Sequence, residues 1–231
     1  MMKKRIHLSL SVILLISCLS AGAMETMPLV YDLYVNKDSP TAVYSDLATL
    51  RLEAEGTGID MDNPPTFTIE GSIHRIFLQF DLSSLPDNAI LTGAEFGIYL
   101  SDIYDLGVSS IQLWDVKNHQ WDNSLNWDNS LALLGNEEAI GISQSFGTED
   151  VDDYIRWTLG DFVDWDFAGA LADQTASFML TLAPEDDFNF AAFNSSDNAA
   201  NHPYFEVSYI PEPATLVLLG LGGVVLRSRK R

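Results

Sequence analysis

Hydrophobic and polar residues alternate in short stretches of this chain. In residues 73–82 (IHRIFLQFDL), Ile76, Leu78 and Phe80 occupy every second position and mostly polar residues lie between them. Residues 94–100 (AEFGIYL) show the same alternation. A period of two residues is typical of a strand with one buried face. The sequence therefore predicts two strands that each turn one side toward a hydrophobic core.

Four further stretches are rich in aromatic and β-branched residues and are separated by turns that contain Asp and Asn; they comprise residues 108–116, 176–182, 188–193 and 205–209. Such composition favours strands. Only residues 150–166 are expected to form a short helix. Irregularly spaced strands without a fixed repeat predict an all-β fold, an antiparallel β-sandwich of jelly-roll type.

The amino terminus has the pattern of a secretory signal peptide. Basic residues 3–5 precede an apolar run, residues 8–19, and Ala21 and Ala23 supply small residues for signal peptidase. We expect a signal helix over residues 1–23 and cleavage after Ala23. An alternative is lipidation of Cys18, the only cysteine. After cleavage at Ala23 the chain has no thiol and no disulfide.

The carboxyl terminus combines a Pro-Glu-Pro triplet, a short apolar run and basic residues. Residues 214–226 would span about 20 Å as a helix, against roughly 30 Å of hydrocarbon in a bilayer. The basic end resists translocation. A buried core helix or an ordinary tail anchor are the alternatives. The triplet consists of Pro211, Glu212 and Pro213, and the basic residues are Arg227, Arg229, Lys230 and Arg231.

This order of features resembles the PEP-CTERM sorting signal of bacterial surface proteins. The resemblance implies that residues 211–231 hold the precursor in the inner membrane through a short transmembrane helix. It also implies that a membrane protease, an exosortase, removes this segment after export. The expected location is the cell surface or extracellular matrix of a Gram-negative-type bacterium.

Residues 24–210 are long enough for one domain with a substantial core. They contain 32 acidic and five basic residues, a formal net charge of −27. Such a charge repels nucleic acid and anionic lipid. The high hydrophobic content, 47% of the whole chain, argues against a disordered acidic segment. We therefore expect a folded extracellular domain that does not bind nucleic acid.

A second resemblance covers residues 31–209. It is carried, in chain order, by FDLSSLP at 80–86, AEFGIYL at 94–100, Trp121, NWDN at 126–129, FNSSD at 193–197 and PYFEVSY at 203–209. These segments look like the DNRLRE-type domain of secreted bacterial proteins. The resemblance implies a jelly-roll sandwich related to carbohydrate-binding modules. Ser196 and Asp197 stand where the family usually has an Arg-Glu pair, so no ligand role is carried over to them.

Residue chemistry gives little indication of catalysis. No nucleophile elbow or zinc-binding pattern surrounds His74, His119 or His202, and His74 is expected on the polar face of its strand. Carboxylates are so numerous that no pair stands out for glycoside hydrolysis. We expect a protein that is not an enzyme, with a polysaccharide-acting enzyme as the less favoured alternative.

Acidic clusters are candidates for structural calcium, because this ion prefers oxygen ligands. None has the spacing of an EF-hand, and a solvated acidic surface is the alternative reading. The candidate ligands are Asp60, Asp62, Asp150, Asp152, Asp153, Asp186 and Asp187.

Tryptophans are candidates for stacking on sugar rings. Trp121 and Trp127 lie in QWDNSLNWDN, and Trp165 lies between two aspartates, so polar groups are at hand for sugar hydroxyls. The alternative is that these rings pack in the core, as we expect for Trp114. The sequence thus favours a non-catalytic exported protein that associates with exopolysaccharide or biofilm matrix. A purely structural surface protein without a glycan site is the alternative.

Overall fold

The computed structural model describes residues 23–54, 57–59, 68–70, 72–104, 109–117, 121–133, 138–141, 143–162, 165–183, 185 and 189–210. Three sequence predictions concern residues outside this description: the signal peptide up to Gly22, the sorting segment 211–231 and four of the candidate calcium ligands (Asp60, Asp62, Asp186 and Asp187). No helix within them is long and apolar enough to span a membrane.

The described part of the chain is an antiparallel β structure, as the sequence predicts. Its strands are β1 (Ala23–Met27), β2 (Leu29–Asn36), β3 (Thr49–Glu53), β4 (Thr57–Ile59), β5 (Thr68–Glu70), β6 (His74–Asp81), β7 (Ile90–Tyr104), β8 (Ser109–Asp115), β9 (Glu138–Ala139), β10 (Gln144–Phe146), β11 (Asp153–Thr158), β12 (Thr175–Ala183), β13 (Phe190–Asn194) and β14 (Tyr204–Ile210). Two short α-helices are described, α2 (Trp127–Ser130) and α3 (Phe167–Ala172).

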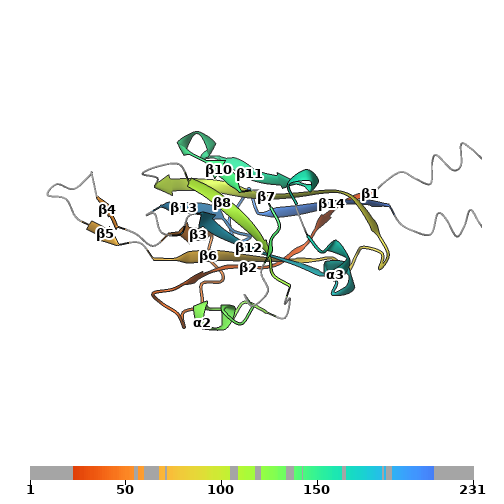
Figure 1. Ribbon diagram of the computed structural model, residues 1–231, viewed down its shortest axis with the longest axis horizontal. Coiled ribbons are helices and arrows are strands. Elements are labelled where there is room, and N and C mark those ends of the chain that lie inside the picture. Colours follow the sequence, from red (N-terminus) through yellow and green to blue (C-terminus); the bar gives the residue numbers. More distant parts are fainter. Residues whose placement is uncertain are drawn as a thin grey trace, which may run out of the picture.

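One curled sheet supplies both layers of the sandwich (Figure 1). Strands β1, β14, β7 and β11 form one layer, and β2, β6, β12 and β8 form the other. Strands β13 and β3 connect them, because β13 pairs with β7 and β3 meets β6 at Glu53 and His74. The core between the layers is strongly aromatic; its fully buried side chains include Phe80, Phe96, Trp157, Phe178 and Phe205.

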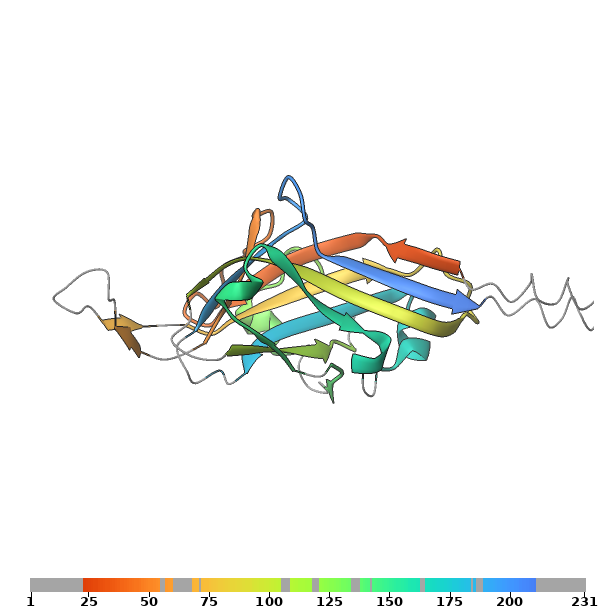
Figure 2. The same ribbon diagram turned by 90° about the horizontal axis from the view of Figure 1, so that it is seen from above.

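The first and last described strands are neighbours. Ala23 pairs with Tyr209 across β1 and β14, so the predicted signal-cleavage position and the end of β14 lie at one end of the molecule (Figure 2). The β4–β5 hairpin lies at the opposite end.

The helix expected over residues 150–166 is wrong. This stretch contains β11, flanked by 3₁₀ turns at Thr148–Asp150 and Leu159–Asp161. Ile155 and Trp157 alternate into the core, which is a period of two residues that the surrounding aspartates obscure. Asp161 accepts hydrogen bonds from Thr158 and so ends the strand.

Two predictions for β6 are also wrong: that only one face of the strand is buried, and that His74 lies on its polar face. The strand is buried on both sides, with Phe77 fully buried and Gln79 only 6% exposed, because residues 121–133 cover its outer face. His74 shares the inward parity of Ile76 and is buried. Desolvation lowers its pKa to about 4, and its Nδ1 lies 3.3 Å from a Glu53 oxygen.

Candidate functional site

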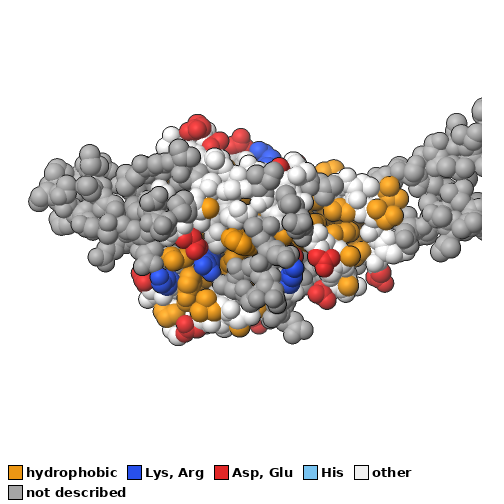
Figure 3. All heavy atoms as spheres, in the orientation of Figure 1, with side chains coloured by type: hydrophobic (Ala, Val, Ile, Leu, Met, Phe, Trp, Pro, Cys, Tyr) orange, Lys and Arg blue, Asp and Glu red, His pale blue; other side chains and the backbone are white. Residues whose placement is uncertain are grey.

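The outer side of the β2–β6–β12–β8 layer carries an apolar cluster. Its buried members are Leu33, Val35, Phe77, Val116, Trp121, Leu125 and Met179, with Tyr31, Trp114, Trp127 and Leu133 packed against them. We call this surface the tryptophan face. Hydrophobic side chains gather around α2 among charged ones (Figure 3). Three of the five tryptophans of the chain therefore lie on one side of the sandwich.

Residues 121–133 are held in place by polar side chains. Asp122 accepts hydrogen bonds from the Ser124 amide and hydroxyl at 2.8 and 2.6 Å. Asn126 and Asn129 exchange side chain to backbone hydrogen bonds in a capping box that starts α2. The Asp128 amide donates to the carbonyl of Pro40. Local capping thus fixes the loop, and Trp121 and Leu125 attach it to the sheet.

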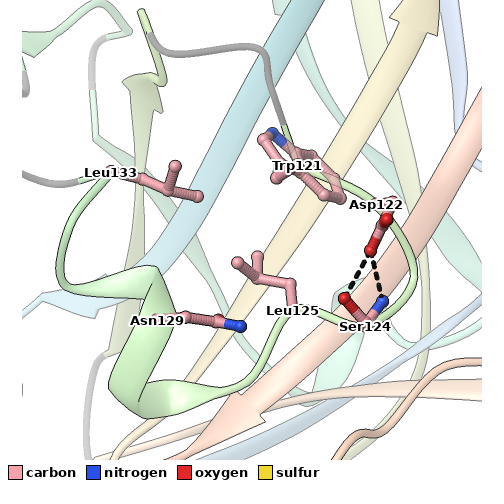
Figure 4. Close-up of a pocket in the computed structure, with 6 residues that line it drawn as sticks. All are labelled: Trp121, Asp122, Ser124, Leu125, Asn129 and Leu133. Carbon is pink, nitrogen blue, oxygen red and sulfur yellow. Dashed lines mark hydrogen bonds between the residues drawn. The ribbon is translucent and has the colours of Figure 1, made fainter.

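A hollow of about 320 Å³ opens in this segment (Figure 4). Trp121, Leu125 and Leu133 form its apolar walls, and Asp122, Ser124 and Asn129 contribute its polar groups. This volume lies at the lower end of the range for small-molecule sites. The combination of apolar walls and a few polar groups suits a ligand with both C–H faces and hydroxyl groups.

The indole of Trp121 is the most informative group in the hollow. It is 7% exposed and packs against Tyr31 and Phe77, with both ring centroids 6.0 Å away. Its Nε1–H is buried and has no hydrogen-bond partner among the described residues. A buried donor without an acceptor is uncommon and costs about 1–3 kcal/mol. An acceptor supplied by a ligand would remove that penalty.

The other polar groups of the hollow are oriented by their own hydrogen bonds. The Oδ1 of Asn129 accepts from the Asn126 amide at 2.8 Å, and Figure 4 shows its amide nitrogen turned toward Leu125 and the hollow. Hydrogen bonds from the Ser124 hydroxyl and amide lower the pKa of Asp122. The hollow therefore offers an amide donor and an ionised carboxylate in addition to the Trp121 ring.

Trp127, the first residue of α2, is partly buried and contacts the sheet through Arg75. The guanidinium carbon of Arg75 lies 5.0 Å from the centroid of the Trp127 ring. Arg75 also donates two hydrogen bonds of 3.0 Å to Glu185. A stacked, bidentate arginine holds both partners rigidly, so α2 is tied to β6.

Trp114 does not pack in the core between the layers, contrary to expectation. It lies on the tryptophan face and lines a second hollow of about 380 Å³ with Arg75, Gln112, Met179 and Thr181 among others. Its Nε1 donates to the Thr181 hydroxyl at 2.9 Å. The alternation in IQLWDV should have shown that Trp114 has the opposite parity to Ile111 and Leu113.

The remaining predicted site residues lie elsewhere. Trp165 packs against Phe162, Phe167 and Phe205 at centroid distances of 5.4–5.6 Å. Its Nε1 also lacks a partner within the described residues, but Trp165 lines neither hollow. The glycan role predicted for Trp121, Trp127 and Trp165 stays a prediction.

The candidate calcium ligands that the structure describes serve local roles. Asp150 accepts a hydrogen bond from the Gly147 amide, and Asp153 lies 3.4 Å from Arg156. Asp152 is exposed and has a positive φ of 67°. Among the described residues, no three His, Cys, Asp or Glu side chains lie close enough to hold a metal ion. Calcium binding stays a prediction.

Comparison with protein families gives two matches that together cover residues 23–231. The sequence profile of carbohydrate-binding module family 96 matches residues 23–209. The chain belongs to carbohydrate-binding module family 96. The PEP-CTERM protein-sorting motif matches residues 210–231, which implies export and cell-surface sorting through exosortase. No curated protein matches the chain.

Family 96 membership points to carbohydrate binding as the role of the described domain. The two matched families are a binding module and a sorting motif. Neither match points to catalysis.

Proposed function

We propose that this family 96 protein is an exported, non-catalytic component of the cell surface or extracellular matrix that binds exopolysaccharide through the hollow at Trp121. In this proposal signal peptidase cleaves after Ala23. The segment from Pro211 onward holds the precursor in the inner membrane until exosortase removes it. The Cys18 lipid alternative is not needed for retention in this scheme.

The indole N–H of Trp121, for which the described residues offer no acceptor, carries the glycan part of the proposal. Sugar hydroxyl oxygens accept hydrogen bonds, and the C–H faces of sugar rings suit the Trp121, Leu125 and Leu133 walls. The Asn129 amide and the Asp122 carboxylate supply a donor and an acceptor for further hydroxyls. A formal charge of −27 over residues 24–210 favours a neutral glycan over an acidic one.

Affinity electrophoresis tests this site. The full-length chain in mild detergent is run through gels that contain the exopolysaccharide of the producing bacterium, with calcium and with chelator. We expect retardation that Trp121→Phe reduces by about 2- to 10-fold in affinity, because one neutral hydrogen bond contributes about 0.5–1.5 kcal/mol. Chelator abolishes it only if calcium orders a part of the site.

Trp114→Phe is the matched control, since it makes the same change on the same face at a ring whose N–H is already paired. Equal losses of affinity for the polysaccharide in the two variants would contradict a specific role for Trp121. Absence of retardation for a folded wild-type protein would leave the purely structural surface protein as the better account.

The sorting part has a separate test. Replacement of Pro211, Glu212 and Pro213 by alanine is expected to leave an unprocessed, membrane-bound precursor. Normal release of this variant would contradict processing by exosortase.

A further inference from the structure

The opposite side of the sandwich carries a compact cluster of tyrosines. It is formed by outward side chains of β14, β7 and β11, where Tyr204, Gly97 and Arg156 lie in one row across the sheet. Tyr99 and Tyr154 form the next row, and Glu95 precedes Gly97 on the outer side of β7. We call this surface, formed by Glu95, Gly97, Tyr99, Tyr154, Arg156 and Tyr204, the tyrosine face.

Tyr204 lies flat on the sheet at Gly97. A Cβ added to Gly97 would be 2.3 Å from Cε1, 2.5 Å from Cζ and 2.8 Å from Oη of the Tyr204 ring. One ring face therefore covers the glycine, and the half-buried ring turns its other face away from the sheet. The absence of a side chain at position 97 is what allows this geometry.

The flat ring is held on two sides. Its hydroxyl donates a hydrogen bond to Glu95, and Tyr154 meets it edge-on at a centroid distance of 5.2 Å and an interplanar angle of 68°. Tyr154 is in turn fixed by donation to the His202 carbonyl at 3.2 Å and by Tyr99, whose ring centroid is 5.2 Å away. The ring is pre-organised, so binding of a ligand does not carry the entropy cost of ordering this side chain.

Charged groups surround the exposed side of the ring. Arg156 is exposed, stacks 5.1 Å from the centroid of Tyr154 and lies 3.9 Å from Glu95. A fixed aromatic plane rimmed by an arginine and a carboxylate can stack on the C–H face of a sugar and bind its hydroxyls. A second copy of this chain is disfavoured as the partner of this plane, because both copies carry a large negative charge and repel each other.

We infer that Tyr204, with Arg156 and Glu95, forms a second glycan contact, and that the two faces let one domain bridge two strands of a neutral polysaccharide. This inference rests on the proposed function, because the Trp121 hollow supplies the other contact. Two contacts on opposite sides cannot bind the same short segment of a chain. The domain then acts as a cross-linker, which raises the avidity of the matrix without new contacts at either site.

Light scattering measures cross-linking separately from binding. The full-length chain in mild detergent is mixed with the long exopolysaccharide of the producing bacterium, and scattering is compared with retardation in affinity gels. The variants are Tyr204→Ala, Arg156→Gln and Trp121→Phe. Arg156→Gln changes an exposed side chain, so it stays informative if Tyr204→Ala does not fold.

The expected result is that wild type is retarded and raises the scattering, whereas Tyr204→Ala and Arg156→Gln are still retarded but lose most of the rise. Unchanged scattering in both variants overturns the second contact and leaves the proposed function intact. Absence of retardation in wild type overturns both. A rise in scattering from wild type alone, lost in Tyr204→Ala without polysaccharide, would assign this face to self-association and overturn the inference.

Discussion

The tryptophan face and the tyrosine face use aromatic residues in opposite ways. On the tryptophan face a separate segment, residues 121–133, covers the sheet. Its Trp121 ring is almost fully buried, and the N–H of that ring has no acceptor within the part of the chain that the structure describes. On the tyrosine face the ring of Tyr204 lies directly on the sheet, and its hydroxyl is paired with Glu95. The first arrangement makes a hollow, and the second makes a platform.

This difference shows how one fold can offer two kinds of surface. A hollow selects a ligand by enclosing it between apolar walls and a few polar groups. A platform contacts one side of a ligand and tolerates variation around it. The two faces should therefore respond differently to truncation, to steric change and to pH.

Trp121→Ala should have the largest effect and should separate the faces most clearly. Truncation of a buried tryptophan costs about 3–5 kcal/mol, so we expect a marked fall in the free energy of unfolding measured by urea titration. Tyr204→Ala should lower the free energy of unfolding much less, because the ring of Tyr204 is only half buried. Similar losses for the two variants would contradict the contrast in burial.

Gly97→Ala should disturb the tyrosine face alone. The added methyl group would overlap the Tyr204 ring at 2.3 Å, and such overpacking costs about 1–3 kcal/mol. We expect a lower melting temperature and loss of polysaccharide cross-linking. Gly93→Ala on the same strand is the control, since its Cβ would lie 3.2 Å from Ser208 Cβ. An effect of Gly93→Ala as large as that of Gly97→Ala would contradict this explanation.

Arg75→Lys should loosen α2 on the tryptophan face. Lysine cannot keep both hydrogen bonds to Glu185 and the stack on Trp127. We therefore expect the free energy of unfolding to fall by about 1 kcal/mol. Hydrogen exchange of residues 121–133 is the direct measurement and should increase. Arg51→Lys, at an exposed arginine 5.8 Å from the Phe190 ring centroid, is the control.

Alkaline pH should reduce the contribution of Tyr204 to the free energy of unfolding, and we expect this to be the smallest of the four predicted effects. Burial and the hydrogen bond to Glu95 raise the pKa of Tyr204 to about 12. Because the folded pKa exceeds the unfolded value of about 10, this contribution to stability is complete below pH 10 and is lost as the pH rises through 12. Tyr204→Phe should remove that part of the pH dependence in thermal unfolding; an unchanged profile would contradict it.

Much of the fold could be predicted from local sequence pattern. Alternation in β6 and β7 gave strands with the correct inward residues, and composition placed β8, β12, β13 and β14 within a few residues of their observed bounds. The pattern does not predict the N-terminal strands β1, β2 and β3, and it predicts a helix where β11 lies. Polar residues interrupt the alternation in these stretches, as the aspartates around β11 do, and the buried positions can be recognised only once the opposite layer is known.

The sequence alone determined the C-terminal sorting signal, the acidity and the all-β class, because each depends on composition or on neighbours within a few positions. The tertiary structure decided which aromatic rings form surfaces. Tyr204 and Glu95 are 109 positions apart, and Arg75 and Glu185 are 110 apart. Strand register brings such residues together, and a shift of one residue would turn each side chain to the opposite face.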